Sequence, residues 1–182
     1  PPFKFLGIYS GKIIFMDTQV ESSEFEGMGL KDELLKGIDS SGFSEPSLIQ
    51  RKGIPAILSG RDVVLQSQSG SGKTAVFAIA SLQKVDIRQS ATQILVLSNT
   101  RELAEQTTKV MMSIGQFMSP KTHTCIGGRS MDEDQRALLG GAQVVSGTPG
   151  RVYDMITRNI LYADKIVMLV LHEADEMLSS GF

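Results

Sequence analysis

Residues 63–74, with the sequence Val-Val-Leu-Gln-Ser-Gln-Ser-Gly-Ser-Gly-Lys-Thr, carry a short apolar run through a Gly- and Ser-rich turn into a helical pattern. Glycines at 70 and 72 let the backbone curl so that successive N–H groups point inward, and the helix start adds the positive end of its dipole. Lys73 can then reach terminal phosphates while the Thr74 hydroxyl binds Mg²⁺. The stretch predicts a phosphate-binding loop made of Ser69, Gly70, Ser71, Gly72, Lys73 and Thr74. The structural alternative is a simple turn followed by a solvated lysine.

The same strand-to-helix pattern recurs along the rest of the chain. The paired segments are residues 63–65 and 73–85, 94–97 and 101–117, 124–126 and 131–139, 143–145 and 151–157, and 166–171 and 174–178. This alternation predicts an α/β fold with a mainly parallel sheet and helices on both faces. Ligands bind at the carboxyl ends of the strands in such sheets.

Composition restricts the class of protein and its compartment. With 182 residues, 41% of them hydrophobic and 21% charged, the chain has globular composition rather than that of a disordered or collagen-like protein. Its longest apolar run, residues 166–171, is far shorter than the roughly 20 residues of a membrane span. Cys125 is the single cysteine, so we expect no internal disulfide, no zinc site and a reducing intracellular location, cytoplasmic or nuclear. The net charge of −2 gives no general attraction to nucleic acid.

The chain divides into three expected parts. Residues 1–20 lack helical periodicity and are expected to be an amino-terminal extension of unknown role. Pro1 in place of Met indicates that the chain begins inside a longer one. Residues 21–60 include a helical stretch at 30–38, and residues 61–182 hold the strand–helix units.

Several motifs follow in a fixed order. They are Gly-Phe-Ser-Glu-Pro-Ser-Leu-Ile-Gln at 42–50, Thr-Arg-Glu-Leu-Ala at 100–104, Gly-Gly at 127–128, Thr-Pro-Gly-Arg at 148–151 and His-Glu-Ala-Asp at 172–175. With the phosphate loop, they resemble the Q motif, motif Ia, GG motif, motif Ib and acidic tetrad of the amino-terminal RecA-like lobe of DEAD-box ATP-dependent RNA helicases. The resemblance covers residues 25–182 and is closest to the initiation factor 4A branch.

This resemblance implies ATP and Mg²⁺ as cofactors. It assigns Gln50 to the adenine edge, with Phe25 and Phe43 packing around the base. A Gln amide offers the donor and acceptor that match adenine, and an aromatic ring can cover a base. The implied catalytic residues are Glu173 as general base, Lys73 on the phosphates and Asp175 as the contact to the family's Ser-Ala-Thr motif.

The resemblance also implies RNA binding through the backbone, without sequence specificity. The implied contacts are Thr100, Arg101, Gly128, Thr148, Gly150 and Arg151. Strand-to-helix junctions can hold phosphates through backbone N–H groups despite the acidic balance. Each threonine can instead cap a helix, and the two roles are compatible. Arg129 is either a further phosphate contact or a solvated side chain.

His172 stands where the family has the first Asp of its acidic tetrad. The Asp holds Mg²⁺, a hard ion that prefers oxygen, whereas a neutral imidazole prefers softer metals. We therefore expect His172 at the metal position beside Thr74 to weaken Mg²⁺ binding and strongly reduce ATP hydrolysis. An engineered change, a sequence error and a natural ATP-clamped variant are all open explanations.

The family pattern continues past residue 182 with the Ser-Ala-Thr motif and a second RecA-like lobe. In the family, the Ser-Ala-Thr strand lies between the strands at 63–65 and 166–171, so its absence is expected to leave a gap in the sheet. The two strands beside the gap would then expose unpaired backbone edges. The alternatives are that other residues or another chain supply the missing strand, or that the sheet rearranges. We expect the chain alone to bind nucleotide weakly and to unwind nothing.

The function predicted by the resemblance is ATP-dependent RNA unwinding or remodelling of ribonucleoproteins, with RNA, the second lobe and initiation-factor or ribonucleoprotein components as partners and no membrane. The alternative is a non-hydrolysing ATP-dependent RNA clamp or scaffold. A P-loop kinase or GTPase is disfavoured because no guanine-reading Asn-Lys-x-Asp element is present and because Gln50, Arg101 and residues 148–151 would remain unexplained. Among other residues, we expect Cys125 to be buried, His123 to be exposed, and the acids at 132–134 to form a helix's first turn rather than a metal site.

Overall fold

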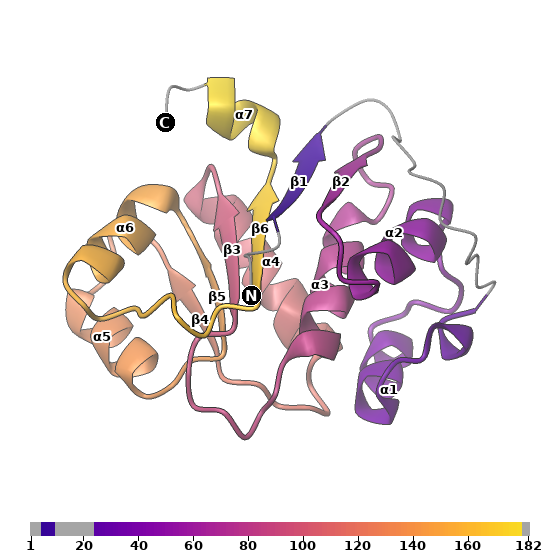
Figure 1. Cartoon of the computed structure of the whole chain (residues 1–182), viewed down its shortest axis with the longest axis horizontal. Helices are drawn as coiled ribbons and strands as arrows, with labels where there is room; N and C mark the ends of the chain where they lie inside the picture. The colour runs from indigo at the N-terminus through magenta and orange to yellow at the C-terminus, as the bar shows by residue number, and fades with distance from the viewer. Residues whose placement is uncertain (1–4, 10–23, 180–182) are drawn as a thin grey trace.

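The computed structural model describes residues 5–9 and 24–179 (Figure 1). In chain order, its elements are β1 (Phe5–Tyr9), the 3-10 helix η1 (Glu26–Met28), α1 (Asp32–Ser40), α2 (Leu48–Leu58), β2 (Val63–Gln66), α3 (Lys73–Lys84), β3 (Ile94–Ser98), α4 (Arg101–Ile114), β4 (Thr122–Cys125), α5 (Met131–Leu139), β5 (Val144–Gly147), α6 (Pro149–Thr157), β6 (Met168–His172) and α7 (Ala174–Ser179). None of the helices within the described ranges is long and apolar enough to cross a membrane.

A six-stranded sheet in the order β2-β1-β6-β3-β5-β4 forms the centre of the molecule, and every neighbouring pair is parallel. The predicted α/β fold with a parallel sheet is confirmed, and each of the five predicted strands is present with its end shifted by a few residues. Because all strands run the same way, their carboxyl ends meet at one edge, where α7 lies in Figure 1.

Alternation along the strands divides the core into two layers. On β3, Ile94 and Val96 join the cluster formed with α1 to α4, whereas Leu95 and Leu97 join the cluster formed with α5 and α6. A strand places successive side chains on opposite faces, so both faces of this sheet must be covered. The alternation also runs through Met168, Val170 and His172 on β6, which places His172 on the face covered by α3 and α4.

The expected gap beside the phosphate-loop strand is absent. β1 fills it, pairing Leu6 to Tyr9 with residues 63–66 of β2 and Phe5 to Gly7 with residues 169–171 of β6. The segment comes from residues 1–20, which we expected to be an extension outside the fold. A strand pairs with its neighbours through backbone groups that nearly every residue has, so the local sequence does not show where in the sheet the strand lies. The remainder of residues 1–20 lies outside the described residues.

Helix α2 was not predicted from the sequence, although its apolar residues Ile49, Ile54 and Ile57 are buried. It packs against α3 and brings the end of the motif at 42–50 to the phosphate loop. Because β1 pairs with β2 and α2 contacts both β2 and α3, these two elements together fix the strand that leads into the phosphate loop.

Substitution Gly7→Pro tests the role of β1. Proline removes a backbone donor from a strand with neighbours on both sides, and an unsatisfied buried acceptor costs about 1–3 kcal/mol. We expect the free energy of unfolding, measured by urea denaturation, to fall by that amount. Leu48→Pro, at the first residue of α2, where proline is tolerated, is the control, and equal effects of the two substitutions would contradict the assignment.

Candidate functional site

The phosphate loop connects β2 to α3 as predicted, and Gly72 is the residue that precedes the helix. Gly72 has a φ of 93°, in the left-handed region that favours glycine. A Cβ at this position would lie 2.6 Å from the side-chain nitrogen of Gln50. Gly72 is therefore required both by its backbone conformation and by the close approach of Gln50.

Lys73 closes the loop on itself. Its ammonium group donates to the carbonyl oxygens of Ser67, at 2.5 Å, and Gln68, at 2.9 Å. Burial lowers the pKa of Lys73, while Glu173 and Asp175 oppose that shift. The charged group is held at the mouth of the loop, with Ser69 and Gly70 exposed and Thr74 half-buried beside it.

The motif at 42–50 reaches the same loop through α2. Gln50 is 3% exposed and accepts a hydrogen bond at 2.8 Å from the backbone N–H of Ser47. The Ser47 hydroxyl in turn donates to the carbonyl of Ser71 in the loop. These contacts fix the Gln50 amide next to the first turn of α3.

The two aromatic residues assigned to the base differ in exposure. Phe25 is 3% exposed and belongs to the core cluster, whereas Phe43 is half-buried and packs against that cluster. Phe43 therefore presents accessible ring surface in this structure, and Phe25 supports the same region from the core.

His172 ends β6 and points into the molecule rather than toward solvent. It is 4% exposed, its Nδ1 lies 3.2 Å from the Thr107 hydroxyl, and its ring meets Phe77 edge-on with centroids 5.0 Å apart. Burial, together with the nearby positive charge of Lys73, lowers the pKa of His172 to about 4. The imidazole is thus neutral at pH 7.

Glu173 follows immediately and has a φ of 61°, an uncommon conformation for a residue with a side chain. Burial raises the pKa of its carboxyl group, with Glu176 and Asp175 adding to the effect and Lys73 opposing it. A raised pKa is suited to a group that accepts a proton near neutral pH. Asp175 lies two residues further on, in the first turn of α7.

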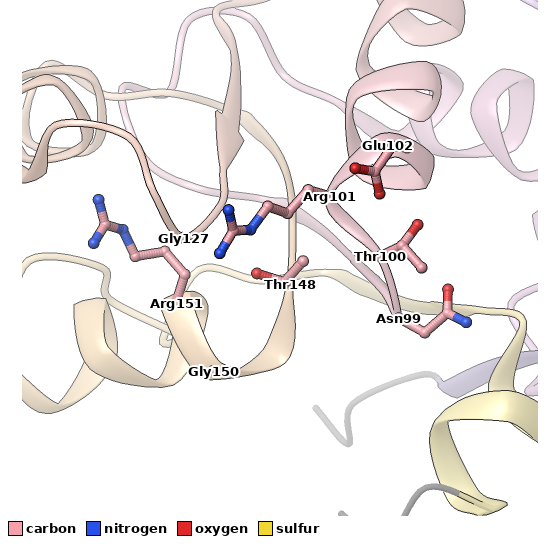
Figure 2. Close-up of a pocket in the computed structure, with 8 residues that line it drawn as sticks. All are labelled: Asn99, Thr100, Arg101, Glu102, Gly127, Thr148, Gly150 and Arg151. Carbon is pink, nitrogen blue, oxygen red and sulfur yellow. The ribbon is translucent and has the colours of Figure 1, made fainter.

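A second site lies at the same edge of the sheet (Figure 2). It is a pocket of about 570 Å³ lined by Asn99, Thr100, Arg101, Glu102, Gly127, Thr148, Gly150 and Arg151. The structure therefore brings together five of the six predicted RNA contacts, and the sixth, Gly128, adjoins Gly127. Thr100 caps α4, because its hydroxyl oxygen accepts a hydrogen bond at 3.1 Å from the backbone N–H of Leu103. This is the capping role that the sequence offered as the alternative for this threonine. A hydroxyl that accepts one bond can still donate another.

The guanidinium group of Arg101 lies close to the glycine pair at 127–128. A Cβ on Gly128, whose φ is 85°, would be 2.7 Å from one terminal nitrogen of Arg101, and a Cβ on Gly127 would be 3.4 Å from the other. The two glycines thus leave room for the guanidinium group along the pocket wall.

Arg151 has a different environment. Its Nε donates to Asp134 Oδ2 at 2.6 Å, and a terminal nitrogen donates to the carbonyl of Arg129 at 2.5 Å. Asp134 is 1% exposed, and its other oxygen lies 2.7 Å from His123 Nε2. The expectation that His123 is exposed is wrong, since only 18% of its side chain is accessible. The acids at 132–134 form the first turn of α5 as expected, but the burial of Asp134 was not predicted.

Cys125 is buried as expected, and burial raises the pKa of its thiol to about 12. Arg129 pairs with Glu105 at 2.7 Å and is half-exposed. No cluster of three potential metal-binding His, Cys, Asp or Glu side chains occurs among the residues that the structure describes.

Comparison with known proteins agrees with this arrangement. Residues 47–182 match the family model for DEAD/DEAH box helicases. The ATP-dependent RNA helicase eIF4A of Coccidioides immitis is 52% identical over 91% of this chain and 43% of its own length, and that of Neurospora crassa is 54% identical over 91% and 41%. The chain belongs to the DEAD/DEAH box helicase family.

Solved structures show the same fold. A DEAD box protein from Methanococcus jannaschii matches with a TM-score of 0.84 and 37% identity, over 89% of this chain and 44% of that one. Saccharomyces cerevisiae Dbp5 L327V, bound to RNA and ADP BeF3, matches with a TM-score of 0.82 and 37% identity, over 88% and 40%. The RecA-like fold of DEAD-box helicases is thus confirmed, and the chain spans about two fifths of the length of the curated relatives it matches.

The low pKa of His172 predicts acid destabilisation. Between pH 6.5 and about 4 the unfolded chain binds a proton that the folded chain does not, so the free energy of unfolding decreases as pH falls, by at most about 3 kcal/mol. Glu173, with its raised pKa, acts in the opposite direction. We expect His172→Gln to flatten the pH dependence measured by urea denaturation at pH 7, 6 and 5. Parallel profiles for the two proteins would refute this explanation.

Gly128→Ala should disturb the pocket while Gly150→Ala should not. Alanine at 128 must adopt a left-handed conformation and contact Arg101, so we expect a loss of about 1–2 kcal/mol in the free energy of unfolding. Gly150 is helical and a Cβ there meets nothing within 4 Å, so alanine is expected to be neutral or to stabilise by up to about 1 kcal/mol. Thermal unfolding of both variants measures the difference, and equal losses would contradict the packing described for Gly128.

Proposed function

We propose that this chain is the ATP- and RNA-binding first lobe of an ATP-dependent RNA helicase that parts short duplexes or remodels ribonucleoproteins. The observation that supports this function best is the position of two sites at one edge of one sheet. The phosphate loop and Glu173 occupy one part of that edge, and the pocket around Arg101 and Thr148 occupies another. Curated relatives bear the name ATP-dependent RNA helicase, and Dbp5 was solved with RNA and a nucleotide.

In the proposed nucleotide site, the backbone N–H groups of Ser69 to Thr74 donate hydrogen bonds to the phosphates of ATP. Lys73 must leave the carbonyls of Ser67 and Gln68 to reach them, exchanging two neutral acceptors for a charged one. Gln50 and Phe43 face the base, with Phe25 behind them. Glu173 accepts the proton of the attacking water, and Asp175 contacts the family's Ser-Ala-Thr motif.

Mg²⁺ fits this site only in part. Thr74 is the second residue of α3, next to Lys73, and its hydroxyl can contribute an oxygen ligand. His172 offers a nitrogen, and its Nδ1 already faces Thr107. When bound, the ion would neutralise phosphate charge, and we propose that His172 makes its binding weak.

The proposed RNA path follows the pocket at the starts of α4 and α6. Thr100, Arg101 and Thr148 present polar side chains there, while Gly128 and Gly150 allow close backbone approach. The Thr148 hydroxyl makes no hydrogen bond to a described residue, so it is available to a phosphate. Contacts of this kind carry no base recognition, which supports binding without sequence preference.

The remaining parts of the proposal concern the longer protein. We propose a second RecA-like lobe as the partner that closes over ATP and RNA, and components of initiation or ribonucleoprotein complexes as further partners. An intracellular location, cytoplasmic or nuclear, accords with these partners.

His172 supports a second candidate function, a clamp that holds ATP and RNA without turnover. A buried neutral imidazole at the position of a metal-binding carboxylate would preserve nucleotide binding while slowing hydrolysis. Retention of RNA on the immobilised longer protein by ATP itself, without a non-hydrolysable analogue, would favour the clamp. RNA-stimulated turnover at the rate usual for the family would exclude it.

Binding of a fluorescent ADP analogue tests the nucleotide site. We expect weak binding by the unchanged chain with little dependence on Mg²⁺, and a gain in affinity of about tenfold with Mg²⁺ for His172→Asp, because a carboxylate restores an oxygen ligand. Fluorescence titration with and without MgCl2 measures both affinities.

Lys73→Ala in the His172→Asp background is the matched control, and it should remove most of the affinity. If neither the unchanged chain nor His172→Asp binds at any Mg²⁺ concentration, the proposed nucleotide site is wrong for this chain. If the unchanged chain already gains affinity from Mg²⁺, the role given to His172 is wrong.

A further inference from the structure

The two arginines of the pocket are held in different ways. Every other arginine of the described residues donates a side-chain hydrogen bond within the chain, as shown by Arg51, Arg61, Arg88, Arg129, Arg136, Arg151 and Arg158. Arg101 donates none to a described residue, although it is exposed at the pocket wall. Its charge is therefore available to a ligand.

Arg151 is committed inside the protein. Its side chain is only 12% exposed, and Asp134, at 1%, is more deeply buried still. Figure 2 shows its guanidinium group directed away from Thr148 and Arg101, toward the other side of the turn at Gly127. Breaking such a pair by taking one partner to an RNA phosphate would leave Asp134 as an uncompensated buried charge, which is costly.

The second bond of Arg151 links this pair to the pocket. By donating to the carbonyl of Arg129, Arg151 ties α6 to the residue that directly follows Gly127 and Gly128. Arg101 lies along these two glycines, so their position determines where its guanidinium group lies. Asp134 on α5 binds Arg151 through one carboxylate oxygen and contacts His123 on β4 through the other.

We propose that Arg151 is a positioning residue, clamped by Asp134, which fixes the turn at 127–129 so that Arg101 alone of the two arginines binds RNA phosphate. This inference rests on the proposed function and gives the two arginines of its RNA site different roles, phosphate binding for Arg101 and positioning for Arg151. It also gives Asp134 a role that the acidic first turn of α5 does not explain, because Asp132 and Glu133 in the same turn are exposed.

The salt dependence of RNA binding separates the two roles. Each phosphate contact to single-stranded RNA contributes about 0.7 to the slope of log K against log salt concentration. We expect Arg101→Gln to reduce the slope by about that amount and Arg101→Lys to keep it. Arg151→Gln and Arg151→Lys should both weaken binding about three- to tenfold with the slope unchanged, because lysine keeps the charge but cannot form both bonds of the guanidinium fork. Fluorescence anisotropy with a labelled U10 oligonucleotide at several KCl concentrations measures these values.

Asp134→Asn gives the opposite result under the two assignments. If Arg151 is a positioning residue, loss of its clamp should weaken RNA binding with an unchanged slope. If Arg151 is a phosphate ligand, freeing it should tighten binding and steepen the slope, which would overturn the proposal. Arg151→Lys with wild-type affinity would overturn it as well. Asp132→Asn, at an exposed position of the same turn, is the matched control for the charge change and should not reproduce the loss.

A double-mutant cycle between Asp134 and Arg151 tests the clamp without RNA. Measured by urea denaturation of Asp134→Asn, Arg151→Gln and the double variant, the coupling should change the unfolding equilibrium constant at least threefold. The exposed pair Arg158 and Asp154, joined at 2.7 Å on α6, is the control and should couple less than twofold. No coupling in the buried pair would overturn the clamp. Failure of the unchanged chain to bind U10 in low salt would instead overturn the proposed function, while the cycle still decides whether Asp134 holds Arg151.

Discussion

The backbone pairing of β1 with both β2 and β6 is the constraint on which the rest of the structure depends. The sheet order places β2 at one side of β1 and the other four strands at the other side, so β1 alone joins the two parts by hydrogen bonds. β2 leads into the phosphate loop and β6 into Glu173. The distance between the phosphate-binding and the acidic parts of the site is therefore set by a strand from the amino-terminal end of the chain.

A strand in this position need supply no special side chain to perform that task. Parallel pairing is satisfied by backbone N–H and C=O groups, and any residue except proline carries both. The strand need only be long enough for its backbone N–H and C=O groups to pair with both neighbouring strands. In this structure, the position that the family resemblance gives to the Ser-Ala-Thr strand is held by β1.

The sequence was sufficient for the parts that depend on neighbouring residues and insufficient for those that depend on distant ones. The phosphate loop, the five strand–helix units and the junction residues Thr100 and Thr148 follow from local patterns, because turn chemistry and alternation act over a few residues. The place of β1 depends on strands more than fifty residues away. His123 was misjudged and Asp134 overlooked for the same reason: Asp134 contacts His123 on β4 and Arg151 on α6, which are both distant from it in the sequence. Three acids in a row at a helix start look alike until one of them is paired.

The arrangement of charge accords with the proposed RNA site on an acidic chain. Its arginines are mostly bound within the protein, to carboxylates in the cases of Arg88, Arg129, Arg151 and Arg158. A surface of this kind attracts little nucleic acid in general, because paired charges cancel at distances beyond a few ångström. One unpaired guanidinium group at a pocket between two helix starts then has a local effect out of proportion to the net charge. Affinity would come from geometry at that pocket, so a displacement of the glycine turn should matter more than the loss of a charge elsewhere on the surface.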